Sequence, residues 1–436
     1  MQRRRRGIKS VALAMVLGLT AAACGDLAGP GAEAGPVGDA ADIDRSRLAD
    51  VDAAQIAEVA DGVDAFGFAL LDELRDGGVG GDGDEAGTVL SPISAAVLLA
   101  LLLPGAEGET AEEIAGALDL DADAVADGRV GALLVELAGA ADVELTLANA
   151  AWFAPDYPVE EAYRDEVRTA LGARVDELDL ADADEVAEID AWADERTDGL
   201  IEEITDALDL PDSNAVGVLA NATHFAADWT DRFDPDDTRT EPFTRDDGSE
   251  VEAELMHHDD TDVFVAVDPD RDLVLARLPY GDHEEANDAR FGFEVLLPTD
   301  ETPIAEVLDD VGAEQWRELS ERARPEELPV ALPAFDLEAE HDLEDPLRAL
   351  GIERAWGDGH DFTGMSPANP WLETVAQKAV IEVDEEGTEA AAVTGGVMAE
   401  SAPAVTEVIV DRSFAFAIRD TETGVPLFLG TVDDPS

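Results

Sequence analysis

The sequence predicts a mixed α+β fold, because helical and strand patterns both recur along its 436 residues. Apolar residues return every three or four positions from Ile56 to Leu74, the spacing of a helix with one buried face. Segments 143–153, 414–419 and 425–432 alternate apolar with other residues, as strands do. Since 46% of the residues are hydrophobic and fall in such periodic segments, intrinsic disorder is a weak alternative.

The first 24 residues have the pattern of a signal peptide. Four arginines and Lys9 precede an apolar run, Val11 to Ala23, that is too short to span a bilayer comfortably. The run ends in AAACGD, which resembles a bacterial or archaeal lipoprotein processing site with Cys24 as the lipidated new N-terminus. Plain secretion with cleavage nearby is the alternative. Either way, we expect an extracellular protein, secreted or anchored to the cell surface.

Cys24 is the only cysteine, so the folded body can form no disulfide bond and depends on its core for stability. Residues 25–55 are rich in Gly, Ala, Pro and Asp and predict a flexible tether. The structured domain is expected to cover 56–436.

Charge is the strongest compositional signal, with 102 acidic residues against 27 basic ones. Five of the basic residues lie in the leader, which leaves 22 and a mature net charge of −80. Such acidity argues against a nucleic-acid partner. At molar salt the Debye length falls to about 3 Å, so exposed charges barely repel one another. The acidic surface therefore predicts adaptation to high salt.

Local patterns also predict helix starts. Ser91 before Pro92 is a capping residue followed by proline at the first helical position, and an apolar run follows. Thr110 and Glu113 have the spacing of a capping box. Residues 328–337 predict a single strand.

No enzyme motif is present: the sequence lacks G-x-S-x-G, H-E-x-x-H and a glycine-rich phosphate loop. The run His257 to Asp260 suggests a metal site at first. Neighbouring residues on a strand point to opposite faces, however, so a shared ion is not expected. We predict no catalytic residue, no metal and no cofactor.

Near its C-terminal end the residue composition of the chain changes. Ala379 to Val383 has the pattern of a strand, an acidic trio follows, and about a dozen residues from Gly387 onward include no large side chain. If this segment entered a sheet as a strand, Thr388 and its alternate neighbours would face inward while Glu389 faced outward. A strand that enters a preformed sheet needs this pattern, since burying a charge costs several kcal/mol. A flexible Gly/Ala-rich loop is the simpler alternative.

EEGTEAAAVT after KAVIEVD resembles the reactive-loop hinge of serpins, the serine-protease inhibitors that act by loop insertion. TVLSPISAAV, AVGVLANATHFAADW and HDLEDPLRALGIERAW match the same family in order. The resemblance implies one large domain in which three β-sheets are surrounded by eight or nine helices, with an exposed loop at about 385–405.

The resemblance also implies two groups of site residues. The hinge comprises Glu385, Glu386, Gly387, Thr388, Glu389, Ala390, Ala391 and Ala392. The sheet-opening region comprises Ser91, Ser94, Asn221, Trp229, Gln377 and Lys378. Gln377 departs from the family, where many members have a histidine. A glutamine still donates and accepts hydrogen bonds but does not titrate, so weaker pH dependence of insertion is expected.

The implied activity is that of a suicide substrate which traps a target serine protease in a covalent complex. Counting from Glu385 places the reactive bond between Ser401 and Ala402, and counting back from Phe414 places it one residue later. Small residues at the bond favour an elastase-like or subtilisin-like target. A monomer is expected, with membrane contact only through the lipid. The alternative is a non-inhibitory surface lipoprotein of the same fold that acts as a binding or scaffold protein.

Overall fold

A computed structural model describes the whole chain except residues 1–10, 21–38, 77–85, 141–142, 209, 212–213, 282, 284–287, 301, 358 and 386–404. The helices are α1 Ala53–Asp76, α2 Pro92–Leu102, α3 Gly108–Ala117, α4 Arg129–Ala138, α5 Glu161–Leu171, α6 Ala183–Arg196, α7 Ile304–Asp310, α8 Ala313–Arg322 and α9 Glu344–Ala349. The first eight strands are β1 Val11–Thr20, β2 Gly87–Leu90, β3 Glu144–Phe153, β4 Arg174–Glu177, β5 Ala215–Ala226, β6 Arg239–Thr244, β7 Glu250–Asp268 and β8 Leu273–Pro279. The others are β9 Phe291–Pro298, β10 Arg324–Pro333, β11 Phe335–Asp342, β12 Leu372–Val383, β13 Val408–Ile409, β14 Phe414–Asp420 and β15 Pro426–Val432.

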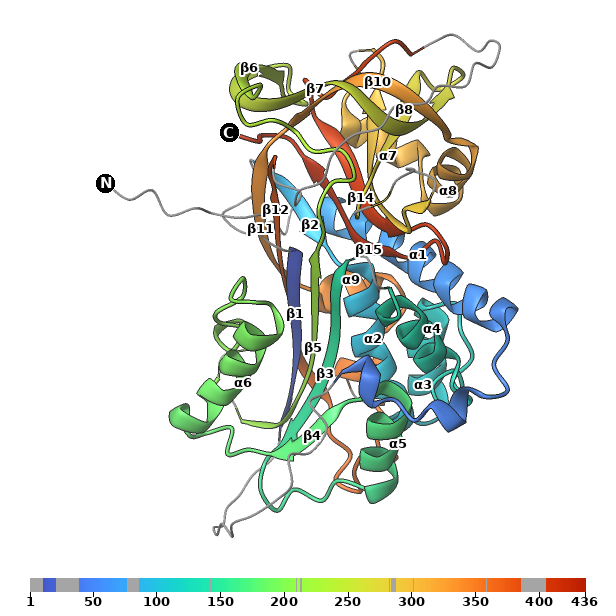
Figure 1. The fold of residues 1–436 in the computed structure, drawn as a ribbon. Helices are drawn as coiled ribbons and strands as arrows, with labels where there is room; N and C mark the ends of the chain where they lie inside the picture. The colour runs from blue at the N-terminus through green and yellow to red at the C-terminus, as the bar shows by residue number, and fades with distance from the viewer. Residues whose placement is uncertain are drawn as a thin grey trace.

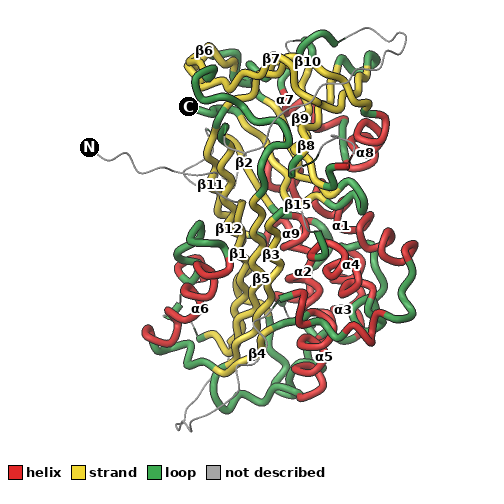
Figure 2. Tube along the Cα trace, viewed as in Figure 1, coloured by secondary structure: helices red, strands yellow, loops and turns green. Residues whose placement is uncertain are grey.

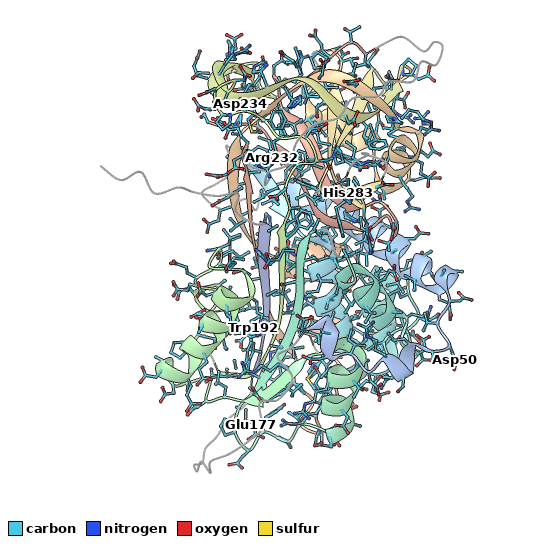
Figure 3. The ribbon with its side chains drawn as sticks, viewed as in Figure 1. Asp50, Glu177, Trp192, Arg232, Asp234 and His283 are labelled. Carbon is cyan, nitrogen blue, oxygen red and sulfur yellow. The ribbon has the colours of Figure 1, made fainter. Side chains whose placement is uncertain are left out.

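One sheet has six strands in the order β11-β12-β1-β5-β3-β4. It lies between helices on both faces, with α6 on one side and α2 on the other (Figure 1). Trp192 of α6 packs edge-on against Trp152 of β3, with ring centroids 5.3 Å apart. Figure 3 marks Trp192 between α6 and the strands. On the other face α2 is buried along its whole length, as its continuous apolar sequence requires.

The second sheet has nine strands: β13-β10-β7-β8-β9-β14-β15-β2 in order, with β6 paired to β7. Strand β7 is 19 residues long, and its successive parts pair with β6, β10 and β8. Because of this long strand, the strands outside the six-stranded sheet form one continuous hydrogen-bonded network (Figure 2). The expected α+β architecture with surrounding helices is confirmed, and the three expected sheets appear as two because β7 joins two of them in one hydrogen-bonded network.

Most local predictions agree with the structure, and two need correction. The segment 328–337 forms two strands, since β10 ends at Pro333 in one sheet and β11 begins at Phe335 in the other. Thr110 and Glu113 do not cap a helix, because α3 begins two residues earlier. Instead, the Thr110 hydroxyl accepts from the Asp361 N–H, and the Glu113 carboxylate accepts from the N–H groups of 353 and 354. Both side chains therefore bond to residues far away in the sequence and not to the start of their own helix.

The packed body begins earlier than residue 56, the boundary predicted from sequence. Two short 3₁₀ helices, Ala40–Asp42 and Arg45–Leu48, lie against the domain, and Ala40 and Ile43 are buried in its core. Gly172 makes this close approach possible. Its φ is +66°, and a Cβ there would lie 2.2 Å from the carbonyl oxygen of Asp39.

We predict that Gly172→Ala destabilises the protein, because alanine disfavours positive φ and its methyl group would displace the chain at Asp39. The free energy of unfolding should fall by about 2 kcal/mol or more. Denaturant titration at molar salt measures it. Gly116→Ala is the matched control, since a Cβ there meets nothing within 4 Å and α3 should gain helix propensity. Equal stability of the two variants would contradict this packing.

Candidate functional site

The site lies where β5 and β12 face each other across a single intervening strand. That strand is β1, which pairs antiparallel with both neighbours. Val11 lies level with Phe225 of β5, and Leu19 lies level with Leu372 of β12. The segment predicted to be part of a signal peptide thus occupies the centre of the sheet, and its removal stays a prediction. We call the space between β5 and β12 the central slot.

Beneath β12, Gln377 holds the start of α2. Ser91 caps α2 as expected, because its hydroxyl accepts from the Ser94 N–H at 3.3 Å. The Gln377 side chain donates to the Ser91 carbonyl at 3.2 Å and accepts from the Ser91 N–H at 3.4 Å. All three residues are fully buried, and the glutamine bonds both backbone groups of Ser91, whose carbonyl also accepts from the Ala95 N–H at 3.1 Å.

Across the slot, Asn221 of β5 is also fully buried. Its amide donates to the Asn149 side-chain oxygen of β3 at 2.8 Å and to the Ala148 carbonyl at 3.2 Å. Its side-chain oxygen accepts from the Thr223 hydroxyl at 3.1 Å. The amide of Asn149 in turn donates to the Leu171 carbonyl at 2.9 Å. These bonds join β3, β5 and the end of α5 into one unit.

Trp229 lies at the far end of β12, where the chain leaves the sheet. Its indole N–H donates to the carbonyl of Asp384, the residue after β12, at 2.9 Å. The ring stacks on Tyr280 with centroids 4.6 Å apart, and burial, with a smaller effect from Asp384, raises the pKa of that phenol. The Thr238 hydroxyl donates to the Glu385 carboxylate. The base of the predicted hinge is therefore held to the body by two hydrogen bonds.

Lys378 faces away from Gln377, as adjacent strand residues must, and its ammonium pairs with Glu338 of β11 at 2.7 Å. It therefore stands apart from Ser91, Ser94 and Asn221. Of the predicted hinge only Glu385 is described; Glu386 to Ala392, the reactive bond at Ser401–Ala402 and Cys24 lie outside the described residues.

Sequence reasoning missed His224, which lies on β5 between Asn221 and Trp229 and is 2% exposed. It shares a strand face with Ala220 and Ala222, which pack toward α6. Burial lowers the pKa of His224, and the nearby carboxylates of Glu144 and Asp198 oppose part of that shift. A polar residue inside an apolar strand pattern was the available signal.

Neither a metal centre nor a membrane-spanning helix is found within the described part of the chain. No three or more histidine, cysteine or acidic side chains gather there in a way that could hold a metal ion. Similarly, none of the helices there combines enough length and hydrophobicity to cross a membrane.

Comparison with known proteins gives a consistent result. A family model described as serpin (serine protease inhibitor) matches residues 61–435. Iripin-8 of Ixodes ricinus is 30% identical over 384 residues, which is 84% of this chain and 91% of that protein. A serpin-like protein of Thermococcus kodakarensis is 33% identical over 387 residues, 86% of each chain.

Solved structures agree in fold. The thermophilic serpin Tengpin in its native state has a TM-score of 0.69 and 23% identity, covering 88% of this chain and 95% of its own. Human thyroxine-binding globulin complexed with its ligand has a TM-score of 0.72 and 24% identity, covering 88% and 100%. At these identities the likeness concerns the fold alone.

We predict that Trp229→Phe lowers the free energy of unfolding by about 1 kcal/mol, because the Asp384 carbonyl loses its indole donor. Thermal or denaturant unfolding at molar salt measures this. Trp371→Phe is the matched control, since Trp371 is 41% exposed and should change stability by no more than about 0.5 kcal/mol. Similar values for the two variants would show that the indole bond contributes nothing.

His224 predicts a pH dependence. Its pKa in the folded protein is below the ordinary 6.5, so the unfolded chain binds the proton first as pH falls. This contribution to stability is complete above pH 6.5 and is lost as pH falls toward the lowered value, by up to about 1.4 kcal/mol per pH unit. In His224→Phe the stability should fall less over that range. If stability falls equally with pH in the wild type and in His224→Phe, His224 is not the group responsible.

Proposed function

This chain belongs to the serpin family, and from that premise we propose that it inhibits serine proteases as a suicide substrate. The serine Oγ of the target attacks the carbonyl carbon of the reactive bond, which we place at Ser401–Ala402. An ester forms with Ser401, and the amine of Ala402 leaves. The severed hinge then enters the sheet as a strand and carries the acylated protease with it before water can hydrolyse the ester.

The central slot is the observation that carries this proposal. The edges of β5 and β12 accept a ten-residue strand that is antiparallel to both. A hinge that turned back after Val383 would enter in the same direction, because it would also run antiparallel to β12. About ten paired residues, at roughly 1 kcal/mol net per hydrogen bond, would release on the order of 10 kcal/mol. That free energy would drive insertion of the hinge and so hold the acylated protease.

The fixed base of the hinge also supports it. Trp229 and Thr238 hold Asp384 and Glu385 beside the end of β12, so movement after cleavage would pivot at a defined point. Speed decides the outcome, since slow insertion lets deacylation release the protease. The small residues after Glu385 and the absence of a charge at Thr388 favour rapid entry.

We further propose that the protein is a prokaryotic lipoprotein that works outside the cell in concentrated salt, attached through Cys24. Like charges meet directly on its surface: Glu327 of β10 is the cross-strand partner of Asp262 of β7. Burial, then Asp231 and Glu327, raise the pKa of Asp262. Such pairs are unfavourable in dilute buffer and are screened at high ionic strength.

Incubation with a subtilisin or an elastase at molar salt should give an adduct that survives detergent electrophoresis. Mass spectrometry should place the cut within Met398–Ala402 or one residue beyond. Cleavage should also raise the thermal midpoint of the inhibitor by tens of degrees, because the inserted strand completes the sheet. Clean cleavage with neither adduct nor stabilisation would overturn the proposal.

A pair of hinge variants tests insertion itself. Thr388→Arg places a charge on the face expected to be buried, so it should convert the inhibitor into a substrate with little or no adduct. Glu389→Arg introduces the same side chain at the next position, on the outward face, and should leave adduct formation near the wild-type level. Equal effects of the two substitutions would contradict the predicted alternation.

A further inference from the structure

One level of the six-stranded sheet carries a row of buried polar side chains. The register places Asn149 opposite Asn221, Asn221 opposite residue 15 of β1, that residue opposite Gln377, and Gln377 opposite His341 of β11. The four named side chains on β3, β5, β12 and β11 are at most 3% exposed. We call these four residues the polar row. Directly opposite residues in antiparallel strands share a face, so the row lies on one side of the sheet.

The row has two halves, separated by the central slot. Asn149 and Asn221 bond to each other and to backbone carbonyls of β3 and α5. Gln377 and His341 bond instead to the segment Thr88–Ser91, which comprises most of β2 and the N-cap residue of α2. Among the described residues, no hydrogen bond links Asn221 to Gln377. The bonding pattern therefore changes at the place where a strand has to enter.

His341 and Asn149 are the members of the row that sequence reasoning did not find, and His341 is the one on the side of β12. Its Nε2 lies 3.0 Å from the Val89 carbonyl and 3.4 Å from the Thr88 hydroxyl. A carbonyl only accepts, so this nitrogen carries the proton and donates. His341 and Val89 are both buried, so water cannot easily replace the donor.

We propose that His341 is a positioning residue for loop insertion. It attaches β11 to Val89 while Gln377 attaches β12 to Ser91, so two adjacent strands are held on one four-residue segment. When the slot opens, β11, β12 and the start of α2 stay in register as one unit, and β3 and β5 separate from them as the other. Without the His341 donor, the edge that receives the hinge is less well defined, and insertion slows. This inference rests on the proposed function.

Three variants test this role at molar salt. His341→Phe keeps a ring but removes the donor, and His341→Gln keeps an N–H donor of similar reach. His341→Asn also keeps a donor, but its side chain is one methylene shorter than that of glutamine. The quantity measured is the stoichiometry of inhibition, meaning the moles of inhibitor consumed for each mole of protease trapped. The Phe variant should raise the stoichiometry of inhibition by about threefold or more. Slower insertion lets more of the acyl-enzyme deacylate and release active protease. The Gln variant should stay near wild type, and the Asn variant should lie between them.

His360→Phe is the matched control. The His360 ring nitrogens also contact backbone carbonyls, at 2.8 and 3.1 Å, but outside the polar row. This variant should keep the wild-type stoichiometry even if its thermal midpoint falls, which separates positioning from general stability. If His341→Phe does not fold, the Asn variant carries the test.

The outcomes are distinguishable from failure of the proposed function. If wild-type protein forms no adduct, the proposed function fails. If wild type forms the adduct and both the Phe and Asn variants trap with unchanged stoichiometry, only the role of His341 fails. A Gln variant as impaired as the Phe variant would also overturn it, because the donor would then not be the relevant group.

Discussion

The facing backbone edges of β5 and β12 must be paired, and the rest of the molecule is arranged around this requirement. An unpaired buried N–H or carbonyl group costs free energy comparable to a lost hydrogen bond, and an open slot would expose a whole row of them. In the structure β1 meets the need along both edges. In the proposed mechanism the segment after β12 meets it. A hinge that turned back after Val383 would run in the same direction as β1.

Side-chain hydrogen bonds reinforce both sides of the slot, whereas β1 is held between them by backbone pairing. Amide side chains tie β3 to β5, and the side chains of Gln377 and His341 tie β12 and β11 to the segment before α2. These bonds lie beside the slot and do not cross it among the described residues. Opening the sheet along this line would break backbone pairs of β1 with one neighbour but would leave the side-chain hydrogen bonds within each half intact.

The large negative charge does not extend unbalanced into the core. Arg419 is 2% exposed and lies between Asp64 of α1, at 3.0 Å, and Glu294 of β9, at 3.3 Å. Arg277 approaches the same Glu294, and the Trp316 indole donates to it at 2.7 Å. Each of these buried charges is paired with an opposite charge and makes at least one hydrogen bond, as burial requires. The excess acidity is therefore a property of the surface, where salt can screen it.

The sequence by itself determined the local features: the buried face of α1, the cap at Ser91, the alternation within β3, β14 and β15, and the acidic surface. Each depends on residues close together in the chain. Through the family resemblance it also pointed to Ser91, Asn221 and Gln377, which lie beside the central slot in the structure. Only the tertiary structure decided that 328–337 divides between two sheets, that Thr110 serves Asp361, and that His341 stands level with Gln377. Those facts depend on strand register between distant segments, which no local periodicity encodes.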